Sequence, residues 1–198
     1  IRENLTKEQV IGFALKKYKI KKDNVKEAYI FKKSIDARDK EDILYNYAID
    51  VELIKDSNVK GAQVVEKYEF PKINISRNSK YNPIVVGAGP AGLFTALILV
   101  QNGIAPIVIE QGSKVEKRIQ DVDKFVNSGI LNTKSNIQFG EGGAGTFSDG
   151  KLTTGNNSPF SRKVLEEFVN FGAPEEILYT AKPHIGTDNL VNIVRNMR

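Results

Sequence analysis

A short apolar run that leads directly into a glycine-rich turn constrains the fold of this chain more than any other feature. Residues 84–86 are β-branched, residues 87–92 have the spacing G-x-G-x-x-G, and residues 93–100 are apolar except for Thr95. β-Branched residues favour a strand. A strand that turns through such glycines into a helix is typical of a nucleotide-binding βαβ unit. We therefore expect an α/β fold with a Rossmann-type unit that starts near residue 83.

Each small residue of this turn has its own expected role. Gly87 permits the tight turn, Gly89 lets the backbone approach a pyrophosphate, and Gly92 lets the helix pack closely on the strand. Pro90 suits the first helical position, where the N–H has no acceptor in the helix. The free N–H groups at the helix start, near Ala91, point at the phosphates. We predict all five of these residues as cofactor contacts.

A carboxylate at the end of the next apolar run strengthens this prediction. Residues 104–109 are apolar and end in Glu110, which lies 18 residues after Gly92. About 20 residues are expected before the acid that binds a ribose hydroxyl. Because a carboxylate repels a 2′-phosphate, NADP is disfavoured at this position. The alternative is a helix-packing glycine motif with an ordinary strand-end charge.

Composition excludes several kinds of site. The chain of 198 residues has no cysteine and one histidine, His184. Disulfides, thiolate metal sites, cysteine nucleophiles and a multi-histidine metal site are therefore excluded within one chain. We also find no signal peptide and no unbroken apolar stretch of ~18 residues, so we expect a cytoplasmic protein with no membrane partner.

The charge of the chain changes near Pro83. Residues 1–82 hold 18 Lys and Arg against 13 Asp and Glu, whereas residues 83–198 hold 11 of each. The lysines alternate with acidic residues, which favours a solvated surface over a nucleic-acid site, although an acidic partner stays open. We therefore expect no nucleic-acid partner.

The pattern of residues 1–72 predicts a small, basic α+β domain of ferredoxin-like type. Thr6 begins a capping-box pattern in front of a helix. Two strand patterns follow at residues 25–31 and 43–54, with a weaker segment at residues 59–70. We expect its core to be formed by Phe13, Tyr18, Tyr29, Tyr45, Tyr47 and Leu53.

Polar residues 73–82 predict a linker between this domain and the glycine-rich part of the chain. After Glu110 we expect a loop with little periodicity at residues 128–159. Helical patterns occupy residues 114–126, 160–171 and 187–197.

A second glycine cluster lies inside the expected loop. Residues 140–151 contain five glycines in twelve positions. Such a segment can adopt positive φ repeatedly and aim its N–H groups at an anion or an electron-rich ring. Residues 145–151 also fit G-x-x-x-x-G-K, but Leu152 stands where a P-loop needs Ser or Thr for Mg²⁺. We therefore reject an NTPase and expect a cofactor-facing role.

Taken together, these segments resemble the bacterial NAD(FAD)-utilising dehydrogenase family, which are FAD-dependent oxidoreductases. The resemblance rests on V-V-G-A-G-P-A-G-L at residues 85–93 and I-V-I-E at residues 107–110. It also rests on S-N-I-Q-F-G-E-G-G-A-G-T-F-S-D-G-K-L-T-T at residues 135–154, and on residues 181–188. It covers essentially residues 30–198.

The resemblance implies that FAD stretches across both glycine segments, with Glu110 on the adenosine ribose. Arg118 matches an arginine that reaches the phosphates or the ribityl region in similar proteins. Because these proteins continue further, we expect residues 83–198 to be the truncated N-terminal part of an FAD- or NAD(P)-binding domain. The flavin side would be approached by Gly142, Gly143, Ala144, Gly145, Thr146 and Ser148.

The catalytic residues stay unassigned. In flavoenzymes the cofactor carries the hydride, and the protein supplies orientation and charge. Lys151 and His184 are candidates for that supporting role, with a small-molecule substrate and NAD(P)H as electron donor. Three alternatives stay open: an NAD-binding dehydrogenase without flavin, a nucleic-acid-associated flavoprotein, and a fragment with only a binding or structural role.

Overall fold

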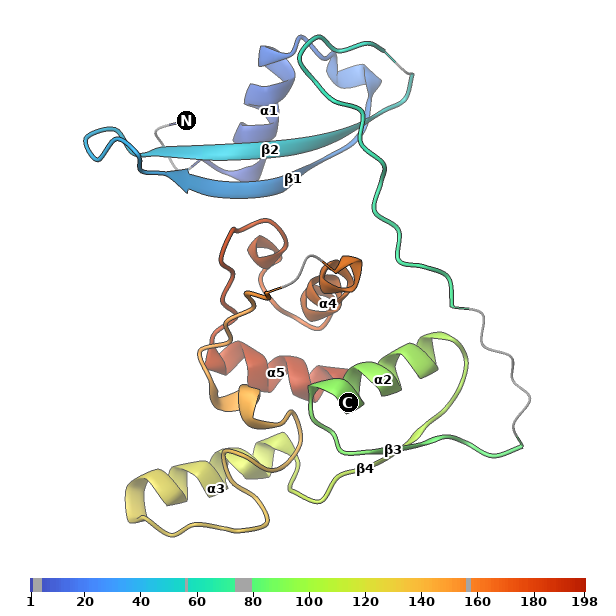
Figure 1. Ribbon diagram of the computed structural model, residues 1–198, viewed down its shortest axis with the longest axis vertical. Coiled ribbons are helices and arrows are strands. Elements are labelled where there is room, and N and C mark those ends of the chain that lie inside the picture. The colour runs from blue at the N-terminus through green and yellow to red at the C-terminus, as the bar shows by residue number, and fades with distance from the viewer. Residues whose placement is uncertain (2–4, 56, 74–79, 156–157) are drawn as a thin grey trace. The chain divides into compact units, whose positions relative to one another are not determined.

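The computed structural model describes residues 1, 5–55, 57–73, 80–155 and 158–198 (Figure 1). Its contacts divide the chain into two compact units. One unit comprises Ile1–Glu69 and Glu175–Pro183, and the other comprises Phe70–Pro174 and His184–Arg198. The first unit thus includes a segment from far along the chain, in addition to the N-terminal residues that the sequence assigns to it.

The first unit is a helix on a β-hairpin. Helix α1 (Lys7–Lys17) has the predicted capping box, because the Thr6 side chain accepts from the Gln9 N–H and the Gln9 side chain accepts from the Thr6 N–H. A 3₁₀ turn, η1 (Lys22–Asn24), leads into β1 (Val25–Asp36), which pairs antiparallel with β2 (Leu44–Leu53). The predicted helix and both predicted strands are therefore confirmed, and β1 is five residues longer than expected.

The core of this unit differs from the expected aromatic one. Val10, Leu15 and Ile30 are buried, whereas Phe13 is 55% exposed and Tyr18 is 38% exposed. Phe13 lies on a flank of α1, since it is ~60° around the helix from Val10 and on the side away from Leu15. Both exposed rings instead line a cleft of about 990 Å³ between α1, β2 and residues 57–65.

The free edge of β1 binds the segment that returns from the C-terminal part of the chain. The Lys33 N–H donates to the Tyr179 carbonyl at 2.6 Å, and the Ala181 N–H donates to the Lys33 carbonyl at 3.1 Å. Just before it, η3 (Glu175–Leu178) buries Ile177. In the described residues no strand forms at 59–70, and a complete ferredoxin-like topology stays a prediction.

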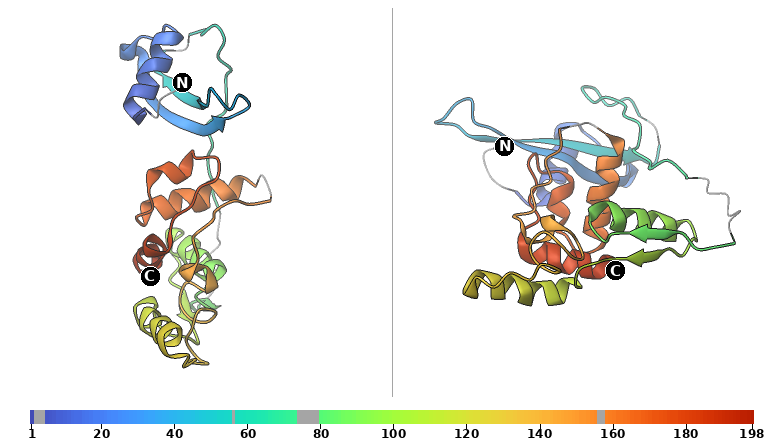
Figure 2. Two further views of the ribbon diagram at one scale, coloured as in Figure 1. Left: turned by 90° about the vertical axis from the view of Figure 1, so that its left-hand side faces the viewer. Right: turned by 60° about the horizontal axis from the view of Figure 1, so that its bottom comes forward.

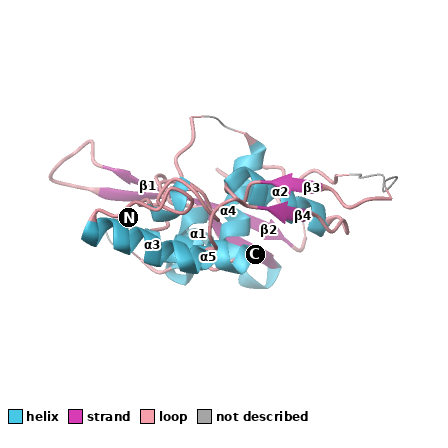
Figure 3. Cartoon of the chain, turned by 90° about the horizontal axis from the view of Figure 1, so that it is seen from below, coloured by secondary structure: helices cyan, strands magenta, loops and turns pink. Residues whose placement is uncertain are grey.

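The second unit begins with the expected βαβ unit. Strand β3 (Ile84–Val86) is followed by α2 (Pro90–Gln101) and by β4 (Ile107–Ile109). The two strands lie side by side and are parallel, with Ile84 opposite Ile107 (Figure 3). The strand–turn–helix–strand prediction is confirmed.

Helix α2 packs against α4 (Pro159–Asn170). The rings of Phe94 and Phe168 meet edge to face at 5.5 Å. The Gln101 amide donates to the buried Glu167 carboxylate at 2.8 Å. Burial alone raises the pKa of Glu167, but hydrogen bonds, the largest from Lys163, bring it below its ordinary value. Away from α4, the strands leave much of Ile84, Val86, Ile107 and Ile109 exposed.

The rest of this unit includes α3 (Val115–Ser128) and α5 (Thr187–Met197), which contact each other, with the 3₁₀ turn η2 (Ala144–Phe147) against α5 (Figures 1 and 2). All three predicted helices, α3, α4 and α5, are confirmed within two residues at each end. In the described part of residues 128–159, which were predicted as a loop with little periodicity, the structure adds one short 3₁₀ turn, η2, and otherwise agrees with the prediction. Among the described residues, no helix is both long enough and apolar enough to cross a membrane. The core is formed by Val115, Leu190, Ile193 and Val194.

Candidate nucleotide-binding site

The turn after β3 has the geometry that the glycine spacing predicts. Gly87 has φ of +95°, and its N–H extends the sheet by donating to the Ile109 carbonyl at 2.6 Å. A Cβ on Gly92 would lie 1.9 Å from the Gly87 oxygen, so helix and turn meet too closely for any side chain there. The predicted packing role of Gly92 agrees with this distance.

Gly89 differs from Gly92, because a Cβ placed on it would meet no atom within 4 Å. It is the N-cap of α2, with extended φ and ψ of −73° and −176°. Pro90 follows at the first helical position, so the next N–H groups, on Ala91 and Gly92, have no acceptor within the helix. The turn therefore offers free donors and open space at a helix N-terminus, which favours an anion.

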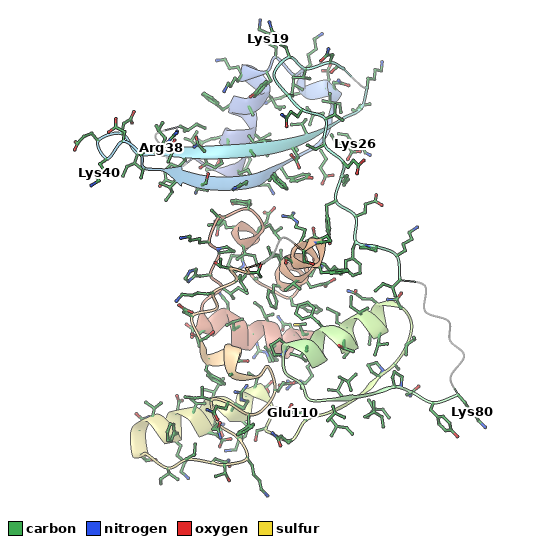
Figure 4. The ribbon with its side chains drawn as sticks, viewed as in Figure 1. Lys19, Lys26, Arg38, Lys40, Lys80 and Glu110 are labelled. Carbon is green, nitrogen blue, oxygen red and sulfur yellow. The ribbon has the colours of Figure 1, made fainter. Side chains whose placement is uncertain are left out.

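Glu110 lies at the carboxyl end of the β3–β4 pair, the end at which α2 also starts (Figure 4). Its carboxylate accepts from the Ala88 N–H at 2.6 Å and from the Gly112 N–H at 2.8 Å. An ionised carboxylate has about four lone-pair sites, so each oxygen retains capacity for a hydroxyl donor. The acid thus holds both adjacent turns and stays able to accept from a ribose.

The second glycine segment lies directly against the first. The Gly142 N–H donates to the Ala88 carbonyl at 2.7 Å. A Cβ on Gly143 would lie 3.1 Å from Pro90 Cδ, and one on Gly112 would lie 2.4 Å from Gly140 Cα. The fold therefore brings the two glycine segments into direct contact, although Ala88 and Gly142 are 54 residues apart in sequence.

Arg118 is fully buried on the inner side of α3 and points at this second segment. Its guanidinium donates to the carbonyl oxygens of residues 136, 137, 140, 141 and 143, and it lies 4.8 Å from the centre of the Phe147 ring. Burial lowers the pKa of Arg118, while the charges of Glu110 and Glu141 oppose that effect. A direct contact between Arg118 and a cofactor stays a prediction.

The remaining predicted contacts lie in and beside η2. Ala144 and Gly145 are exposed, whereas Thr146 is buried against Gly142. The Ser148 hydroxyl donates to the Gly145 carbonyl at 2.7 Å and is exposed at the end of the turn. This part of the segment presents small residues and little side-chain bulk, as a close approach to a ligand requires.

Lys151 and His184 are brought together by an isolated antiparallel bridge. Both side chains are exposed. The Lys151 ammonium lies 3.3 Å from the Asp149 carboxylate. Neither contact assigns a catalytic role, so both residues stay candidates.

Two residues of this site were missed in the sequence. The buried Glu141 carboxylate accepts from the Val115 N–H at 2.8 Å and therefore caps α3 from a distant segment; it also pairs with Arg198 at 2.8 Å. Gly112 is required by the contact with Gly140. Glu141 stands in the E-G-G string of the second glycine segment. Its partners are 26 and 57 residues away in sequence, and no local pattern indicates such pairs.

Comparison with known proteins identifies a cofactor for this part of the chain. Residues 80–122, which contain β3, the glycine turn, α2, β4 and Glu110, match the family of FAD binding domains. The cofactor of this region is FAD. The match supports an FAD-dependent oxidoreductase family, and it covers the first glycine segment but ends before the second.

Two further similarities concern the rest of the chain. Residues 1–52 match a domain of unknown function, DUF8436. An uncharacterized protein of the bacterium Clostridium beijerinckii is 44% identical over 190 residues, which are 92% of this chain and 36% of that protein. The chain therefore spans about a third of the length of this relative.

Proposed function

We propose that residues 83–198 form the N-terminal part of a Rossmann-type domain that binds the ADP moiety of FAD in a bacterial FAD-dependent oxidoreductase. The observation that carries this proposal is the open position at Gly89. A Cβ there would meet no protein atom within 4 Å, whereas a Cβ on Gly92 would lie 1.9 Å from the Gly87 oxygen. Protein packing therefore does not require a glycine at this position, whereas a pyrophosphate at the helix N-terminus would need the open space.

The residues of the chain fit this cofactor. The N–H groups at the start of α2 would bind the pyrophosphate, with Gly87 and Gly92 shaping the turn. Glu110 would accept from the adenosine ribose, as its free lone pairs permit. The small residues from Gly142 to Ser148 would lie toward the flavin side. When bound, the isoalloxazine ring supplies hydride transfer.

We extend the proposal to the longer protein as follows. Further strands would cover the exposed apolar side chains of β3 and β4, since a large exposed apolar patch usually marks a surface that binds another element or molecule. NAD(P)H would be the electron donor and a small molecule the substrate, in the cytoplasm.

The test is to purify the full-length protein, release its ligand by heat, and identify the ligand by mass and fluorescence. The proposal expects FAD together with flavin absorbance bands in the native protein. NAD in place of FAD, without these bands, would support the flavin-free dehydrogenase. A protein that retains no nucleotide and does not bind added FAD would refute both.

A further inference from the structure

Arg118 differs from Glu110, the other charged residue among the predicted cofactor contacts, because its charged group has no hydrogen-bonding capacity left over for a ligand. Its six hydrogen bonds use all three guanidinium nitrogens. Every acceptor is a main-chain carbonyl oxygen between residues 136 and 143. A guanidinium has five N–H donors, so this arrangement leaves none for a ligand.

We propose that Arg118 is a positioning residue that turns the carbonyl groups of Glu141 and Gly143 inward, so that the N–H groups of the same peptides, on Gly142 and Ala144, face the first glycine turn and the FAD site. The inference rests on the proposed function, because it assigns Arg118 a role in shaping that site. It differs from the direct phosphate or ribityl contact that the resemblance implies.

Peptide geometry connects the two sides of the segment. In a trans peptide the C=O and N–H bonds point in opposite directions. The Glu141 carbonyl accepts from Arg118 at 2.5 Å, and the N–H of the same peptide, on Gly142, donates to the Ala88 carbonyl at 2.7 Å. The guanidinium and the first glycine turn therefore hold opposite edges of one peptide plane.

The next inward carbonyl belongs to Gly143, which accepts from Arg118 at 2.9 Å. The N–H on the other side of that peptide is on Ala144 and points away from Arg118. Ala144 is exposed and begins η2. This N–H is thus a donor whose direction depends on Arg118, beside Gly143 and its neighbour Pro90.

Gly140 shows that the segment is built around this side chain. Gly140 has φ of +115°, and a Cβ there would lie 2.4 Å from Arg118 Cδ. The arginine therefore occupies the volume that any larger residue at 140 would need. Because one side chain requires the other position to be glycine, changes at the two positions are expected to be strongly non-additive.

The test compares amide hydrogen exchange and FAD binding in the full-length protein. Without cofactor, Arg118→Ala is expected to speed exchange at residues 141–144 by about tenfold or more, since the carbonyls lose their common donor. FAD affinity is expected to fall by about tenfold or more, the effect of one misdirected hydrogen bond to a charged phosphate. Guanidinium ion at a non-denaturing concentration should restore both readouts.

Two other variants complete the comparison. Gly140→Ala should reproduce both effects, and the double variant Arg118→Ala/Gly140→Ala should be little worse than either single variant. If Arg118→Ala does not fold, Gly140→Ala alone provides the comparison with the wild-type protein. Arg195→Ala is the matched control, because Arg195 is exposed on α5 and bonds to the Asn192 side chain. Neither readout should change in this control.

Three results would overturn the proposal. They are unchanged exchange at residues 141–144 in cofactor-free Arg118→Ala, additive effects at positions 118 and 140, and normal FAD affinity in Arg118→Ala. A fall in affinity with unchanged exchange would indicate a direct cofactor contact instead. If the wild-type protein bound no FAD, the proposed function would fail alone, because the exchange comparison needs no cofactor.

Discussion

Substituting valine for Gly89 separates binding of the cofactor from stability of the fold. The backbone at Gly89 is extended, which is the conformation that a residue before proline prefers and that valine readily adopts. A Cβ there meets nothing within 4 Å. The remaining cost is the poor N-cap preference of valine, about 1 kcal/mol or less. We therefore expect Gly89→Val to fold.

The expected effect on FAD is much larger. The valine side chain would fill the space that the pyrophosphate needs beside the first free N–H groups of α2. Each hydrogen bond to a charged group contributes about 1.5–3 kcal/mol. Loss of two such bonds raises the dissociation constant roughly a hundredfold to ten-thousandfold.

Flavin fluorescence titration measures the affinity, and thermal unfolding of the cofactor-free protein measures stability. Gly92→Val is the matched control, because its Cβ would lie 1.9 Å from the Gly87 oxygen. This control should lose stability before any question of binding arises. Wild-type FAD affinity in a folded Gly89→Val protein would refute the assignment of the pyrophosphate to this turn.

Three further changes are expected to have smaller effects. Glu110→Ala removes a charged acceptor and should weaken FAD binding roughly ten- to a hundredfold. A dissociation constant equal to that of the wild-type protein in calorimetric titration would contradict the ribose role. Gly12→Ala should stabilise the protein by about 0.5–1 kcal/mol in chemical denaturation. The reason is that Gly12 lies in α1 and that an added Cβ would meet no atom within 4 Å. A denaturation midpoint below that of the wild-type protein would count against this. The hydrogen bond from Arg198 lowers the pKa of Glu116 from 4.5 to about 2. The pair therefore supports the folded state fully above pH 4.5 and loses this effect as the pH falls toward 2. Arg198→Ala should lower the urea midpoint at pH 6 but not at pH 2, and an equal loss at both pH values would argue against it.

The sequence predicted those parts of the fold and of the site that are determined by residues close to one another in the chain. The G-x-G-x-x-G spacing fixes a strand, a turn and a helix within a dozen residues, and the structure has all three elements. The capping box at Thr6 is confirmed for the same reason, since its two hydrogen bonds join residues three apart. Glu110 was found because its distance from Gly92 follows from the length of one βαβ connection.

Long-range contacts were beyond this kind of reasoning. Nothing near Arg118 in sequence indicates that its donors bind carbonyls 18 to 25 residues away. The prediction that Phe13 and Tyr18 belong to the core of the first unit is wrong. Helical periodicity places Phe13 near one side of α1 but does not say which side of the helix is covered. The segment at residues 175–183 that joins β1 has no strand pattern in the sequence. The N–H and carbonyl of Lys33 hold it, and a bridge to one residue does not require an alternating pattern.

That segment has a consequence for synthesis and proteolysis. Lys33 leaves the ribosome 146 residues before Tyr179, to whose carbonyl its N–H bonds. The hairpin therefore emerges with one edge unoccupied and must stay so while the whole glycine-rich region is translated. In the finished protein, a protease cut between the two units near residue 72 would not release the N-terminal piece, because Glu175–Pro183 belongs to the same compact unit and would remain bound to it.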